Sequence, residues 1–142
     1  MMLLRRLTVE DHAAILALWQ RAGLHSLRPQ GRDSRQALAD QLAQGQVVLG
    51  LEEDGKLVAC VLITDDTRKG WINRLAVDPK YRRQGLGARL IAEAENELRK
   101  RGVQVFAALI HDDNLASLGL FQRKGYKTHD IVYMSKRDSE DA

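Results

Sequence analysis

The chain has 142 residues, of which 44% are apolar and 29% are charged, so it is long enough for one globular domain with a buried core. It contains no apolar run that could cross a bilayer, and no apolar segment near its start that would indicate a secretory signal. With Cys60 as its single cysteine, it has no disulfide framework. We therefore expect a cytoplasmic protein without a membrane partner.

The first half of the chain predicts a strand, two helices and a hairpin, over residues 3–7, 8–22, 33–44, 46–51 and 56–64. In the first helix, Ile15, Leu18, Trp19 and Ala22 recur at helical spacing and define one core face. Thr8 resembles the start of a capping box, and an Asp-Gly pair marks the hairpin turn.

The second half predicts a strand, a helix, a strand, a helix and closing strands, over residues 71–77, 88–101, 103–110, 114–124, 126–127 and 131–134. Asp113 or Asn114 is expected to open the last helix, which Gly125 ends. The polar residues 138–142 are expected to fray, so that residues 1–137 form a single domain.

The run Arg82-Arg83-Gln84-Gly85-Leu86-Gly87 lies between a predicted strand and a predicted helix. The first amides of a helix have no intrahelical partners, and the helix dipole adds partial positive charge at the same end. Glycine lets a phosphate approach the backbone closely. The run matches neither the dinucleotide fingerprint nor the P-loop. It nevertheless predicts an anion site.

This loop is similar to the Arg/Gln-x-x-Gly-x-Gly/Ala signature of the GNAT superfamily, the acyl-CoA-dependent N-acetyltransferases, with Arg82, Gly85 and Gly87 at its fixed positions. A second block, from Asn114 to Tyr126, resembles the later Asn-x-x-Ala…Tyr-x-x-x-Gly-Phe segment of that family. The resemblance implies the GNAT fold, an α/β (α+β) domain with a mixed, mostly antiparallel sheet flanked by helices in the order β-α-α-β-β-β-α-β-α-β.

The resemblance also implies acetyl-CoA as the acyl donor. Loop amides would hold its pyrophosphate, the main chain of the preceding strand would pair with its pantetheine arm, and the second block would reach the same arm. The residues implied are Leu75, Ala76, Val77, Arg82, Arg83, Gln84, Gly85, Leu86, Gly87, Ala88, Asn114, Ser117 and Phe121. As side chains, Arg82 and Arg83 also fit a solvated surface, and Asn114 fits a helix N-cap. We expect no metal.

The implied reaction is direct attack of a primary amine on the acetyl thioester within a ternary complex. An amine with a pKa near 10.4 is only about one part in a few thousand neutral at pH 7, so a base is useful. Where the family often has glutamate, this chain has other residues, which leaves Asp65, Asp66, His111 and Asp112 as candidates. The usual tyrosine acid is replaced by Phe121, and Tyr133 is a further candidate.

Two other functions stay open. The missing acid and base positions allow an acyl-CoA-binding sensor or scaffold with little catalysis. The sequence pI of about 9.2 would suit a nucleic-acid-binding protein, but the basic residues are dispersed among acids and we expect no nucleic-acid partner. The acceptor, a small-molecule or protein amine, is not specified, and a homodimer is one open state. In the loop 23–35, Arg28, Arg32 and Arg35 would either bind an acidic group on the acceptor or only solvate the loop.

Overall fold

The structure is a computed structural model that describes residues 1–142. Its strands are β1 (Met2–Arg6), β2 (Val47–Glu53), β3 (Lys56–Asp65), β4 (Gly70–Val77) and β5 (Phe106–Ala107). Its helices are α1 (His12–Arg21), α2 (Arg35–Ala43), α3 (Leu86–Lys100) and α4 (Leu115–Arg123), with short 3-10 helices η1 (Val9–Asp11) and η2 (Pro79–Tyr81) before α1 and α3. None of the helices is long and apolar enough to cross a membrane.

The strands form one sheet in the order β1-β2-β3-β4-β5. Strands β1 to β4 are antiparallel, and β5 runs parallel to β4. The predicted hairpin between β2 and β3 is confirmed: Asp54 and Gly55 have φ angles of 50° and 79° at its turn, as a tight hairpin requires. The predicted fold class, a mixed and mostly antiparallel sheet flanked by helices, is therefore confirmed.

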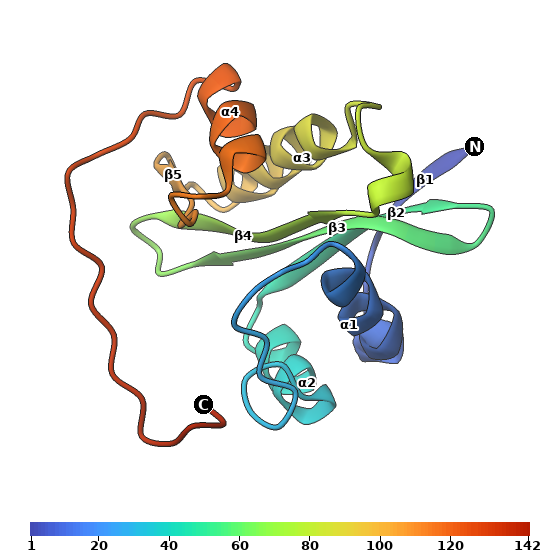
Figure 1. The fold of residues 1–142 in the computed structure, drawn as a ribbon, viewed down its shortest axis with the longest axis horizontal. Coiled ribbons are helices and arrows are strands. Elements are labelled where there is room, and N and C mark those ends of the chain that lie inside the picture. The colour runs from blue at the N-terminus through green and yellow to red at the C-terminus, as the bar shows by residue number, and fades with distance from the viewer.

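Helices cover both faces of this sheet, with α1 and α2 on one side and α3 and α4 on the other (Figure 1). Under α3, the side chains of Leu90, Ile91 and Leu98 are fully buried against the sheet. Under α1, Ile15 and Leu18 are buried in a second apolar cluster on the opposite face. For α1, the helical spacing of Ile15, Leu18 and Trp19 in the sequence therefore identifies the buried face correctly, whereas Ala22 is the C-cap and is only partly buried.

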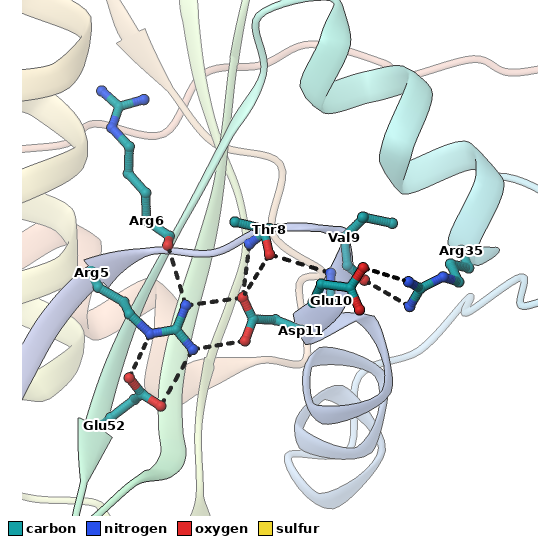
Figure 2. Close-up of polar contacts among 8 residues, drawn as sticks. All are labelled: Arg5, Arg6, Thr8, Val9, Glu10, Asp11, Arg35 and Glu52. Atoms are coloured by element: carbon teal, nitrogen blue, oxygen red, sulfur yellow. Dashed lines mark hydrogen bonds and ion pairs between the residues drawn. The ribbon is translucent and has the colours of Figure 1, made fainter.

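One arginine fastens β1 to its neighbours (Figure 2). The guanidinium of Arg5 donates to Glu52 on β2 at 2.6 Å (Nε to Oε1) and to Asp11 at 2.7 Å (Nη2 to Oδ1). Asp11 also accepts from the amide of Thr8 at 2.8 Å and completes the predicted capping box at the start of η1. This network fixes the position at which α1 leaves the first strand.

The sheet opens between β4 and β5. Only Gly70 with Phe106 and Trp71 with Ala107 are paired, and beyond them the two strands separate. In β4, the register with β3 shifts at a bulge, where Arg74 adopts a positive φ of 50°. A non-glycine residue in this conformation is strained by about 1 kcal/mol or more. The bulge at Arg74 therefore lies in the part of β4 that has no partner on β5.

Two predictions about the C-terminal part are wrong. The strand expected over residues 103–110 is reduced to β5, and the closing strands expected over residues 126–127 and 131–134 do not form. Beyond α4 the chain leaves the sheet and runs past its edge toward α2 (Figure 1). Because β5 offers a ladder of only two residues, a C-terminal strand has little edge to pair with. The last strand of the predicted order is therefore absent.

Candidate active site

The glycine loop, residues 82–87, connects η2 to α3. Just before it, the buried Asp78 accepts hydrogen bonds from the amide of Lys80 at 2.9 Å and from Arg21 at 3.1 Å (Nε to Oδ2). The Lys80 amide, helped by the charge of Arg21, holds the pKa of the Asp78 carboxyl below its usual range. Within the loop, Gly85 has a φ of 77°, a left-handed conformation that favours glycine. The chain is thus held by hydrogen bonds at Asp78, and the loop that follows turns sharply into α3 at Gly85.

The backbone amides of residues 82–88 donate no hydrogen bond to any other group of the protein. The first helical bond of α3 runs from the Arg89 amide to the Gly85 carbonyl at 3.0 Å, and no side chain caps this helix. These amides lie at the positive end of the helix dipole, in the same loop as Arg82 and Arg83; the Arg82 guanidinium donates to the Ala22 carbonyl at 3.4 Å (Nη2 to O). Such a cluster of free amides can hold a phosphate group.

A groove of about 1150 Å³ contains this loop. Its other walls are residues 72–77 of β4, residues 108–111 beyond β5, the first turns of α4 and the loop between α1 and α2. Gly87 belongs to the wall at which α3 meets α4, and a Cβ added there would lie 2.8 Å from Leu120 Cδ2. The groove therefore joins the free amides to the separated strands.

Of the predicted cofactor-binding residues, Gln84 alone does not line the groove. The others do line it: Leu75, Ala76, Val77, Arg82, Arg83, Gly85, Leu86, Gly87, Ala88, Asn114, Ser117 and Phe121. Asn114 is the N-cap of α4 and accepts from the Ser117 amide at 3.2 Å (N to Oδ1). Residues far apart in the sequence thus meet on one surface, although their binding role stays a prediction.

The aromatic residues near α4 place no hydroxyl in the groove wall. Phe121 is buried there, and its ring meets that of Tyr126 edge-on at 5.0 Å between centroids. The Tyr126 hydroxyl donates to Glu95 at 2.7 Å, and burial together with this bond raises the pKa of Tyr126. Tyr133 is exposed beyond α4 and does not line the groove. None of these groups is placed to protonate a thiolate in the groove.

The candidate bases are dispersed. Asp66 lies in the turn between β3 and β4, where the amides of Lys69 and Arg68 hold its pKa low, and its neighbour Asp65 binds Arg101 at 3.0 Å. Neither of these carboxylates lines the groove, and Asp112 does not line it either. His111 is the candidate that does.

Sequence reasoning missed several residues of the groove, among them His25, Arg74 and Asp33. His25, from the loop between α1 and α2, meets the ring of His111 edge-on at 5.9 Å between centroids. Arg74 on β4 donates to Asp33 at 3.1 Å (Nη2 to Oδ2). His25 and Asp33 lie in the loop expected to contact the acceptor, but no spacing singles them out. Arg74 is a charged residue within an apolar strand, which is the one signal that could have marked it.

Known proteins resemble this chain over most of its length. A model of the acetyltransferase (GNAT) family matches residues 9–126. An acetyltransferase of Pectobacterium atrosepticum is 30% identical over 133 residues, which cover 93% of this chain and 92% of that protein. The PaiA N-acetyltransferase of Thermoplasma acidophilum, crystallised with coenzyme A, superimposes with a TM-score of 0.82 at 20% identity and covers 93% of each chain.

A further structure, a predicted acetyltransferase of Clostridium acetobutylicum with acetyl-CoA, superimposes with a TM-score of 0.80 at 16% identity over 96% of each chain. These two neighbours thus hold the cofactor, or its acetylated form, that the glycine loop predicts for this chain. The family match spans the glycine loop, the separated strands and α4. The resemblance stated from the sequence is confirmed: the chain belongs to the GNAT family of acetyltransferases.

Proposed function

We propose that this protein transfers an acetyl group from acetyl-CoA to a primary amine, by direct attack within a ternary complex. The observation that carries the proposal is the row of free amides at residues 82–88, which opens into the groove between β4 and β5. Because acetyl-CoA is a metabolite of the cell interior, we also propose that the protein works in the cytoplasm.

The free amides of the glycine loop suit the pyrophosphate, and Arg82 and Arg83 add positive charge beside them. The main chain of Leu75, Ala76 and Val77 faces the opening between β4 and β5, where an extended arm can pair as an added strand. Bound there, acetyl-CoA would supply a thioester whose carbonyl carbon an amine can attack.

His111 is the residue we propose to take the proton of the amine, directly or through water. Of the candidate bases it is the one that lines the groove, and imidazole is the side chain best suited to accept a proton near neutral pH. Phe121 carries no hydroxyl, and the tyrosine that does line the groove, Tyr81, lies beside the glycine loop rather than on α4, so we propose that the thiolate leaves without a protein acid. A thiol with a pKa near 8.5 permits this, at the expense of turnover.

The test follows thiol release from acetyl-CoA with a panel of primary amines, for the wild type and three variants. Ala88→Glu adds a carboxylate at the free amides, whereas Ala92→Glu adds the same charge one turn further along α3, outside the groove. We expect Ala88→Glu to raise the KM for acetyl-CoA at least tenfold and Ala92→Glu to leave it unchanged. His111→Gln should lower kcat and leave that KM unchanged.

The second candidate function, an acyl-CoA sensor, is favoured because the candidate bases other than His111, and the candidate acid Tyr133, do not line the groove. The buried carboxylate that does line it, Asp33, is already paired with Arg74 at 3.1 Å. Acetyl-CoA binding that is lost in Ala88→Glu, without thiol release for any amine, would support the sensor and contradict the transferase. No acetyl-CoA binding at all would contradict both functions.

A further inference from the structure

The part of the groove formed by β4 and the loop between α1 and α2 carries a net positive charge. Its charged lining residues are Arg32, Arg74 and Asp33, so one of the two guanidinium charges is not balanced within this set. The other carboxylate that lines the groove, Asp113, lies at the start of α4, on a different wall. An acceptor bound here would therefore meet an excess of positive charge.

Arg74 is held in place but is not fully paired. Its side chain is 16% exposed, its Nη2 donates to Asp33, and its guanidinium carbon lies 4.7 Å from the centre of the Trp19 ring. Its Nη1 is buried without a hydrogen-bond partner. A buried donor without a partner costs about 1 to 3 kcal/mol, and more when it is charged. Because Arg74 lines the groove, a small turn of its side chain would bring this unmet donor to an acceptor atom bound there.

Arg32 stands close enough to Arg74 to repel it. Burial lowers the pKa of Arg74, Asp33 opposes that effect, and the charge of Arg32 lowers the pKa further. Arg32 itself is exposed, and its one hydrogen bond runs to the Ser26 carbonyl at 3.2 Å. An anion beside both guanidinium groups would relieve their repulsion and satisfy more of their donors.

The other arginines of this segment are directed elsewhere. Arg35 donates to Glu10 at 3.0 Å and to the Val9 carbonyl, and Arg28 donates to the Leu27 carbonyl; neither lines the groove. Of the three arginines considered from the sequence, only Arg32 lines the groove. The structure adds Arg74, which directly precedes Leu75 in the strand that we propose to pair with the pantetheine arm.

We propose that the acceptor amine carries a carboxylate, which binds against Arg74 and Arg32, so that the acceptor is an amino acid rather than a polycation. This inference rests on the proposed function and names the acceptor class of the same site. A carboxylate accepts two parallel N–H bonds from a guanidinium, a geometry that a lone ammonium or amide cannot match. A polyamine would instead bring further positive charge toward two arginines.

The test compares each L-amino acid with its own amide, and with spermidine, as acceptors in thiol release. The amide has the less basic amine and is the easier nucleophile near pH 7, so chemistry alone favours it. We expect the best amino acid to exceed its amide at least tenfold in kcat/KM, and to exceed spermidine by more. An amide that reacts as well as the acid, or a preference for spermidine, would overturn the proposal.

Variants assign the preference to these residues. Arg32→Gln should reduce the ratio of acid to amide at least fivefold, whereas the matched control Arg35→Gln, which removes the same charge outside the groove, should keep it. Arg74→Lys keeps the charge but loses the fork, and should also reduce the ratio. An unchanged ratio in Arg32→Gln and Arg74→Lys, both folded by circular dichroism and binding acetyl-CoA normally, would contradict the assignment.

Calorimetry separates the failure of this inference from that of the proposed function. The amino acids and their amides are titrated into the protein loaded with CoA. Binding of an acid but not of its amide, without turnover, would uphold the carboxylate site and contradict the transferase. Turnover of amines without preference for the acid would uphold the transferase and contradict the site. If no amino acid binds and none reacts, the carboxylate site is refuted.

Discussion

Gly70, the first residue of β4, is predicted to tolerate no side chain because of one neighbour on α3. A Cβ at this position would lie 2.4, 2.6 and 2.9 Å from Cδ1, Cδ2 and Cγ of Leu98. Leu98 is fully buried, so its side chain has little room to move. The Gly70 amide also donates to the Val105 carbonyl at 2.8 Å, which holds the strand at the point where β4 meets β5.

The size of the effect follows from that overlap. In an open strand, Gly→Ala would stabilise by about 0.5 to 1 kcal/mol, but overpacking a buried site costs about 1 to 3 kcal/mol. Leu98→Ala alone should cost about 2 to 5 kcal/mol through its cavity. In the double variant, the new methyl group enters that cavity instead of a filled space. We therefore expect the double variant to lose no more stability than Leu98→Ala alone.

Urea unfolding of the four proteins, followed by circular dichroism, measures this as a double-mutant cycle. The predicted coupling is favourable, about 1 to 3 kcal/mol, with similar m-values for all four proteins. Losses that add to within about 0.5 kcal/mol would refute the reasoning, since independent sites add in this way. Such a result would mean that α3 does not press on the β4–β5 junction from which the groove opens.

Three further outcomes are expected. Arg5→Met should lower stability by about 1 to 2 kcal/mol at pH 7, measured by urea unfolding. Arg5 holds the pKa of Asp11 below its unfolded value near 3.9, so its contribution to stability is fully present above pH 3.9. The difference in free energy of unfolding between wild type and Arg5→Met should therefore shrink as the pH falls through the lowered pKa of Asp11. A difference that does not change with pH would contradict this prediction. Burial raises the pKa of Cys60 to about 12, so a thiol reagent at pH 8 should label the protein only in denaturant. Phe121→Tyr should speed the chemical step in single-turnover assays. No gain in rate would contradict the view that a missing acid at position 121 slows departure of the thiolate.

The sequence predicts best what local chemistry determines. Gly85 and Gly87 mark the loop because a left-handed turn and free helix amides are properties of neighbouring residues. The same holds for the capping box at Thr8, whose amide donates to the Asp11 carboxylate at 2.8 Å. Local features of this kind are enough to predict the fold and the loop that we propose to hold the cofactor.

The acceptor end of the groove could not be predicted in this way. Arg74 and Asp33 are 41 residues apart, and their pairing depends on a bulge in β4 that no local pattern announces. The predicted closing strands are absent for a related reason. An apolar run such as residues 131–134 has strand character, but a strand forms only where another strand offers a ladder, and β5 is too short to offer one.

The most direct test of the account is calorimetric titration of acetyl-CoA into the wild type, Ala88→Glu and Ala92→Glu. We predict micromolar binding to the wild type and to Ala92→Glu, and at least tenfold weaker binding to Ala88→Glu, because the added carboxylate repels the pyrophosphate at the free amides. Equal binding to all three folded proteins would contradict the placement of the pyrophosphate on the glycine loop. Absence of binding to the wild type would contradict the proposed function itself.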